Sequence, residues 1–128
     1  MTAWREWLWV ATGSALGGVL RFGLAHALQG FAPGGIPLAT FTVNVLGSAV
    51  FGWLMARQGQ TPMPSAYFLG LTTGVLGGFT TYSTFNGEVL RHALAGHVGR
   101  ASLYAAATFA VCLLGSALGW ALALRGTG

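Results

Sequence analysis

Residues 72–85 read TTGVLGGFTTYSTF, and this stretch decides the fold. It lies within a long apolar segment, yet Gly77 and Gly78 stand near its centre, with β-branched residues on either side. Both residue types weaken an α-helix, so we predict a broken helix here. At membrane depth, a non-helical backbone is tolerated only where protein covers it or where it lines a cavity. The alternative is a plain kink that holds no ligand.

Outward from this stretch, the chain divides into four apolar segments, at residues 7–28, 38–56, 66–95 and 101–124. Each has about 19 residues or more, and a helix needs about 20 to cross the hydrocarbon core. We expect one all-α transmembrane domain over residues 1–128, with four membrane helices and both termini on the same side. A cleavable signal peptide over the first segment is the alternative, but Arg21 interrupts the apolar run that it would need.

The composition favours a lipid-facing protein and disfavours much chemistry. Hydrophobic residues make up 54% of the chain and charged residues 6%, whereas a soluble domain carries about 25% charged residues. The arginines are scattered, lysine and aspartate are absent, and Cys112 is the single cysteine. A nucleic-acid interface, a Schiff-base lysine, a two-carboxylate hydrolase and a thiolate metal cage are therefore all disfavoured. We do not expect an enzyme.

The arginines indicate no preferred orientation in the membrane. Three lie on the side of the termini and three on the other side: Arg5, Arg57 and Arg125 against Arg21, Arg91 and Arg100. Because the bias in lysine and arginine sets topology, this balance predicts insertion in both orientations and pairing as an antiparallel dimer. The alternative is an orientation set by features that charge counting misses.

Glycines and other small residues recur four positions apart inside the predicted helices, as in Gly13 and Gly17, or Gly115 and Gly119. Such pairs let membrane helices approach closely. Four helices packed this tightly leave little room for a pathway inside one subunit. A pore would therefore need a second copy of the chain.

Polar residues form two stripes on the predicted helices. On the second helix, Asn44 has Thr40 and Ser48 one turn to either side. On the fourth helix, the same spacing of four connects Tyr104, Thr108, Cys112 and Ser116. Lipid cannot satisfy these groups. They either form hydrogen bonds between helices or line a polar path.

Tyr82 and Phe85 continue an aromatic spacing of three residues, and Ser83 and Thr84 lie between them. Packing is one interpretation of such a stripe. However, aromatic ring edges are electropositive and hydroxyls are donors, so this segment suits an anion. No carboxylate precedes Glu88 within a predicted span, whereas a cation pathway normally uses rings of Asp or Glu. We therefore favour an anion as the transported species.

These residues resemble the Fluc (CrcB) family of small fluoride channels. The matching elements are GGVLR at 17–21, TVN at 42–44 with Gly47, and GGFTTYSTF at 77–85, which is close to the family signature GGxTTFSTF. The similarity covers essentially the whole chain. It implies a dual-topology homodimer in the bacterial inner membrane, with two antiparallel pores that export fluoride passively.

The resemblance also implies where ions bind. It implies a structural Na⁺ on the dimer axis, held through the backbone carbonyls of Gly77 and Thr80. It implies an anion pathway formed by Asn44, Tyr82, Ser83, Thr84, Phe85, Tyr104, Thr108, Cys112 and Ser116. Arg21 would raise the positive potential at an entrance, or else anchor the end of the first helix at the interface.

Two positions depart from the family pattern. Tyr82 stands where the motif has its first Phe, which adds a hydroxyl to the implied pathway. Cys112 stands where the family tends to have a Ser, and a thiol is a weaker donor than a hydroxyl. We expect slower conduction than is typical of the family, or an altered ion-contact site.

Three other functions fit less well. A small dual-topology multidrug antiporter needs a carboxylate within its first helix, and Glu6 lies before it. A non-transporting assembly protein would explain the small-residue packing but not the polar stripes. A proton-coupled fluoride carrier would need a titratable group such as Glu88, which we instead place in an interfacial cluster with Arg91 and His92.

Overall fold

The computed structural model describes residues 3–126, which contain helices and no strands. Three helices are long and apolar enough to cross a membrane: α1 (Ala3–Ala27), α2 (Leu38–Gln60) and α6 (Val98–Arg125). The remaining apolar segment is divided into α3 (Ser65–Leu69), the π-helix η2 (Gly70–Leu76), α4 (Gly77–Phe79) and α5 (Tyr82–Leu94). A short 3-10 turn, η1 (Pro33–Gly35), lies between α1 and α2.

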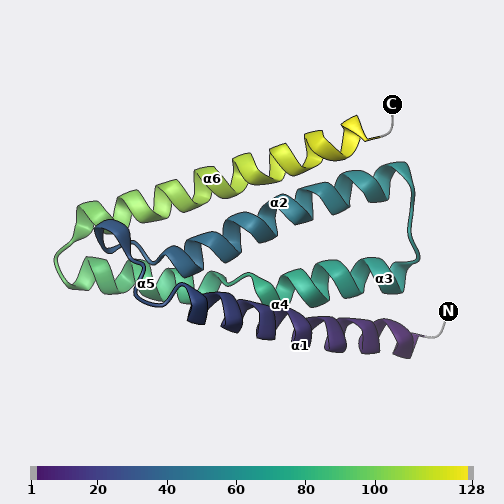
Figure 1. The fold of residues 1–128 in the computed structure, drawn as a ribbon, viewed down its shortest axis with the longest axis horizontal. Helices are drawn as coiled ribbons and strands as arrows, with labels where there is room; N and C mark the ends of the chain where they lie inside the picture. The colour runs from purple at the N-terminus through teal and green to yellow at the C-terminus, as the bar shows by residue number, and fades with distance from the viewer. Residues whose placement is uncertain (1–2, 127–128) are drawn as a thin grey trace.

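The four apolar segments of the chain run up and down along one long axis and pack in two pairs (Figure 1). The helix α2 lies against α6, while α1 lies against α3, η2 and α4. Beyond the break, α5 packs on the first part of α6. The two termini lie at the same end of the molecule, as the even number of apolar segments predicts (Figure 1).

Glycines bring each pair of helices into close contact. A Cβ atom added to Gly17 would overlap the Val75 carbonyl oxygen of η2. One added to Gly119 of α6 would overlap the Ala49 carbonyl oxygen of α2. These helices therefore touch backbone to backbone, as the small-residue pairs predict.

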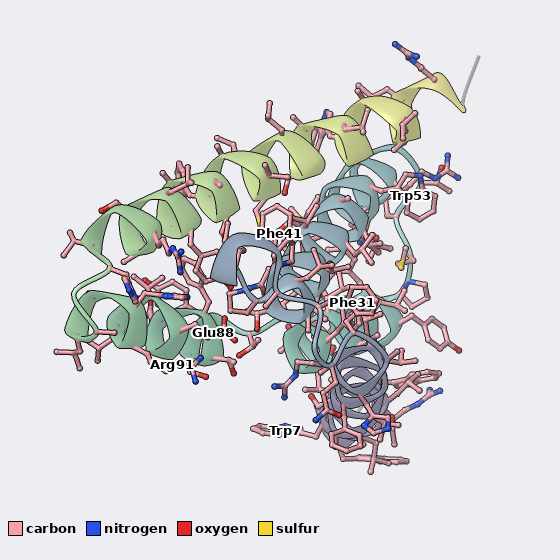
Figure 2. All side chains as sticks on the ribbon, turned by 60° about the vertical axis from the view of Figure 1, so that its left-hand side comes forward. Trp7, Phe31, Phe41, Trp53, Glu88 and Arg91 are labelled. Atoms are coloured by element: carbon pink, nitrogen blue, oxygen red, sulfur yellow. The ribbon has the colours of Figure 1, made fainter. Side chains whose placement is uncertain are left out.

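Large apolar side chains point outward instead of filling a core. Trp7, Phe22 and Leu94 are each about three-quarters exposed, and Figure 2 shows Trp7 pointing away from the bundle. The largest fully buried side chains are Val43 and Tyr104. An apolar surface of this extent suits hydrocarbon and not water.

The end of α5 follows from one glycine. Gly96 has a φ of 79°, in the left-handed region. The Gly96 amide donates to the Ala93 carbonyl at 3.0 Å, and the His97 amide donates to the His92 carbonyl at 2.9 Å. This is a Schellman cap, which turns the chain sharply into α6.

In the third apolar segment, the non-helical residues are Thr80 and Thr81. The predicted break at Gly77 and Gly78 is therefore displaced by a few residues. Thr80 has a ψ of 160°, and Thr81 has φ −149° and ψ 114°, so both are extended. Gly77 and Gly78 stay helical because α4 packs closely on α1. A Cβ on Gly78 would lie 2.5 Å from the Ser14 carbonyl oxygen.

Candidate functional site

An open groove of about 780 Å³ lies between α2, the break after α4, and α6. Most of the residues predicted for the ion sites line it: Asn44, Gly77, Thr80, Tyr82, Phe85, Thr108, Cys112 and Ser116. Four other predicted residues do not line it: Arg21, Ser83, Thr84 and Tyr104. None of its lining residues is charged. The groove therefore presents hydroxyl, amide and thiol groups among apolar side chains.

The break is held by Asn44, which reaches it from the middle of α2. The Asn44 side chain pairs with both polar groups of the Thr81 backbone. Its Nδ2 donates to the Thr81 carbonyl oxygen at 3.0 Å, and its Oδ1 accepts from the Thr81 amide at 2.8 Å. A side-chain amide thus replaces the hydrogen bonds that an unbroken helix would make. One N–H of Nδ2 remains for another acceptor.

Thr81 also begins the next helix. Its Oγ1 accepts from the Thr84 amide at 3.2 Å, which is an N-cap interaction for α5. The Thr81 hydroxyl donates in turn to Thr84 Oγ1 at 3.0 Å. Thr84 therefore participates in the cap, and Ser83 is exposed on α5.

Arg21 has a partner that the sequence did not predict. Its Nε donates to the Gly78 carbonyl oxygen at 3.0 Å, across 57 residues of chain. This carbonyl is at the C-terminal end of α4, where a cation is favoured by the helix dipole. The guanidinium of Arg21 thus ties α1 to the break.

The aromatic residues form a short row from the groove rim into the protein. The rings of Tyr82 and Phe85 have centroids 6.1 Å apart, and those of Phe85 and Tyr104 are 5.3 Å apart in an edge-to-face arrangement. Tyr82 is 76% exposed, whereas Tyr104 is fully buried. The added hydroxyl of Tyr82 therefore lies at the outside of the row.

The four polar residues of α6 differ in what they contact. Thr108 Oγ1 is buried without a hydrogen-bond partner, and no other side-chain nitrogen or oxygen of residues 3–126 is in that position. Cys112 is a free, partly buried thiol. Ser116 Oγ donates to the Ser48 carbonyl oxygen at 3.0 Å. Only part of the stripe is therefore used in bonding between helices.

Tyr104 belongs to a buried triad that the sequence pattern did not reveal. Its hydroxyl donates to Glu88 Oε2 at 2.8 Å, and the Thr40 hydroxyl donates to Glu88 Oε1, also at 2.8 Å. Glu88 is only 8% exposed, and it lies on the side of α5 that faces α2 (Figure 2). It has no ion pair with Arg91 or any other described cation. The predicted interfacial cluster with Arg91 and His92 is wrong, because two hydroxyls draw the carboxylate inward.

Comparison with known proteins identifies the family to which this arrangement belongs. The family model described as CrcB-like protein, Camphor Resistance (CrcB), matches residues 8–120. The chain belongs to the CrcB family.

Relatives within the CrcB family share most of the chain. A protein of Thermus thermophilus is 40% identical over 117 residues, which cover 91% of this chain and 92% of the relative. One from Sorangium cellulosum is 38% identical over 123 residues, covering 94% and 95%. One from Idiomarina loihiensis is 40% identical over 104 residues, covering 81% of each. All three are named fluoride-specific ion channel FluC.

The backbone of this CrcB-family chain offers the kind of oxygen ligands that a hard cation requires. Such cations take oxygen ligands, and backbone carbonyls serve this purpose. Gly77 and Thr80 both line the groove. In a continuous helix their carbonyls would accept from the amides of Thr81 and Thr84, but those amides donate to side chains. These two residues therefore fit a cation site built from carbonyl oxygens.

Proposed function

We propose that this chain is a fluoride-specific ion channel. The observation that carries the proposal is the uncharged groove, in which the Thr108 hydroxyl is buried without a partner. An unsatisfied buried polar group costs about 1–3 kcal/mol, and an anion in the groove would relieve this cost. The shared name of the relatives supports the same function.

The groove suits a small and strongly hydrated anion. A pathway for fluoride must replace its water shell with donors held at close range. The Thr108 hydroxyl, the Cys112 thiol and the spare N–H of Asn44 supply donors, and the Phe85 ring supplies an electropositive edge. Because no carboxylate lines the groove, the anion meets no repulsive charge there.

Tyr104 contributes differently, because its hydroxyl is already bound to Glu88. An anion that approaches Tyr104 must compete with this carboxylate for the hydroxyl proton. We place Tyr104 at the end of the pathway, where this competition would weaken binding and let the ion leave. A conducting site has to bind the ion weakly enough to release it.

We propose further that a second, antiparallel copy covers the groove and completes two pores. The rim carries large exposed apolar side chains, among them Tyr82, Phe109 and Leu113. Arg21 is bound to the Gly78 carbonyl at the break, so we do not count it among the loop arginines that set orientation. Of the remaining arginines, three lie at the end of the bundle that holds both termini and two lie at the opposite end. This difference is a weak bias for setting orientation. A location in the bacterial inner membrane belongs to the same proposal.

Dual orientation can be tested with a single introduced thiol. A cysteine is placed at Gln60, in a Cys112→Ser background, at the end of α2. A membrane-impermeant maleimide added to intact cells should label about half of the chains, since half present this end of α2 outward. Complete labelling, or none, would contradict the antiparallel dimer.

We also propose that Gly77 and Thr80 hold a structural Na⁺ through their carbonyls, with the same pair from the second copy. The bound ion would supply a fixed positive charge that ties the two copies together. Each copy would contribute two carbonyl oxygens whose helical amide donors are bound elsewhere, so that two copies give four.

A proton-coupled fluoride carrier is the second candidate, because Glu88 is a buried carboxylate close to the groove. Coupling would require Glu88 to change protonation during each transport cycle. The hydroxyls of Thr40 and Tyr104 instead hold the Glu88 side chain in one place between α2 and α6.

Fluoride efflux from proteoliposomes tests the proposed function. Purified protein is reconstituted in liposomes loaded with fluoride or chloride, and release is followed with ion-selective electrodes after potassium and valinomycin set the voltage. The channel predicts fast fluoride release, no chloride release, and no requirement for a pH gradient. Release that needs a pH gradient would favour the carrier, and no release from a folded dimer would contradict both.

A further inference from the structure

Two side chains at the break divert the amides that would otherwise block the proposed cation ligands. In an α-helix, each carbonyl accepts from the amide four residues later. For Gly77 that amide belongs to Thr81, and it donates to Asn44 Oδ1 at 2.8 Å. For Thr80 it belongs to Thr84, and it donates to Thr81 Oγ1 at 3.2 Å. Each of the two carbonyls therefore loses its helical donor to a different side chain.

Three neighbouring carbonyls at the break are satisfied from within the protein. The Leu76 carbonyl accepts from the Thr80 amide and from Thr80 Oγ1, both at 2.9 Å. The Gly78 carbonyl accepts from Arg21 at 3.0 Å, and the Thr81 carbonyl accepts from Asn44 at 3.0 Å. The carbonyls of Gly77 and Thr80 receive none of these hydrogen bonds. Freed carbonyls at helix breaks inside membranes are typical cation ligands.

We propose that Asn44 and Thr81 are positioning residues of the cation site, in addition to any contact that Asn44 makes with the anion. Each accepts an amide hydrogen that would otherwise return to a ligand carbonyl. Asn44 also holds the Thr81 peptide by its second bond, which fixes the direction of the extended residues. This inference rests on the cation site in the proposed function, and it links the second helix to that site.

The proposal makes acceptor atoms, and not side-chain size, the feature that matters. Thr81→Val keeps the shape and removes the Oγ1 acceptor, so the Thr84 amide returns to the Thr80 carbonyl. Thr81→Ser keeps the acceptor and should restore binding. Asn44→Leu removes the acceptor for the Thr81 amide, whereas Asn44→Gln keeps an amide with both the acceptor and the donor.

The test measures Na⁺ binding by the full-length protein in detergent, without measuring transport. Thermal unfolding is recorded over a titration of sodium gluconate, with N-methyl-D-glucamine gluconate maintaining ionic strength, and ²³Na NMR linewidths are read in parallel. Losing a ligand carbonyl to an amide should weaken Na⁺ binding at least about tenfold in Thr81→Val and in Asn44→Leu. Thr81→Ser and Asn44→Gln should bind Na⁺ within about threefold of the unmodified chain. Thr12→Val, on α1, is the matched control, since Thr12 bonds only to carbonyls of its own helix.

Each outcome has a separate meaning. Unchanged Na⁺ affinity in Thr81→Val, or an equal loss in Thr81→Ser, would overturn the positioning role. If Thr81→Val does not fold, Asn44→Leu compared with Asn44→Gln decides the same question. No Na⁺ effect on the unmodified chain would overturn the cation site itself. Fluoride release by the same preparation is measured alongside, so that a failed channel with intact Na⁺ binding is distinguished from a failed site.

Discussion

Replacing Tyr104 by Phe tests the buried triad of Thr40, Glu88 and Tyr104 by removing one hydroxyl group. The side chain is fully buried, and its ring meets Phe85 edge to face at 5.3 Å. Its hydroxyl donates to Glu88 Oε2 at 2.8 Å. Phenylalanine preserves the ring packing and removes only the hydroxyl, so the change reports on this hydrogen bond.

The structure sets the size of the expected effect. After the substitution, Glu88 would keep one donor, the Thr40 hydroxyl at 2.8 Å. A hydrogen bond to a charged group contributes about 1.5–3 kcal/mol. We expect the free energy of unfolding to fall by about this amount, and towards its upper end, because Glu88 is only 8% exposed and has no cationic partner among residues 3–126.

The assay is equilibrium unfolding in mixed micelles, arranged as a double-mutant cycle with Glu88→Gln. Against the neutral amide, Tyr104→Phe should cost only about 0.5–1.5 kcal/mol. Tyr82→Phe is the control, since that hydroxyl is at the exposed rim, and it should change stability by less than about 0.5 kcal/mol. If Tyr104→Phe costs the same in both backgrounds, within about 0.5 kcal/mol, then the charge of Glu88 plays no part and the reasoning is refuted.

Four further substitutions test the groove and the helix packing. Asn44→Asp should suppress fluoride release from proteoliposomes, because it places negative charge in the path; unchanged flux would remove Asn44 from the pore. Phe85→Ile should lower flux while the protein still elutes as a dimer by light scattering, whereas a monomer would make Phe85 an interface residue. Gly119→Ala should lower the free energy of unfolding by about 1–3 kcal/mol, because its methyl group would overlap the Ala49 carbonyl oxygen; no change would show that α2 and α6 separate easily. Thr108→Val should raise the free energy of unfolding by about 1–2 kcal/mol while lowering flux, since it replaces an unsatisfied hydroxyl; undiminished flux would exclude this hydroxyl as a donor.

The length and spacing of the apolar segments predict the membrane helices. They do not predict where each helix begins and ends. The first helix begins at Ala3 and not at residue 7, because Trp4 and Glu6 extend the helix beyond the apolar run. Glu6 accepts from the Ser65 hydroxyl at 2.6 Å, a contact across 59 residues. Local sequence carries no signal for such a contact.

The position of the break shows how tertiary packing overrides local propensity. Glycines weaken a helix, yet Gly77 and Gly78 remain helical because α4 packs closely on α1. The chain instead becomes extended at Thr80 and Thr81, where Asn44 replaces the lost hydrogen bonds. Propensity alone locates the weak segment but cannot say which of its residues has a compensating partner.

The candidate site was predictable where its residues recur on one helix face. The stripe on α6 and the position of Asn44 on α2 both follow from a spacing of four. The triad of Thr40, Glu88 and Tyr104 joins three separate helices, so no periodicity reveals it. One available signal was that Glu88 is a rare carboxylate three residues after Phe85, on the helix face that packs inward.

The reversal potential in a planar bilayer tests the central claim most directly. The bilayer has a tenfold fluoride gradient, with equal chloride and equal pH on both sides. A passive fluoride-selective channel then predicts a reversal potential of about 59 mV, with the sign that the fluoride gradient sets. This value should not move when a pH gradient is added. A reversal potential near zero would mean that chloride carries the current, and one that shifts with pH would mean proton coupling; either result would contradict the account.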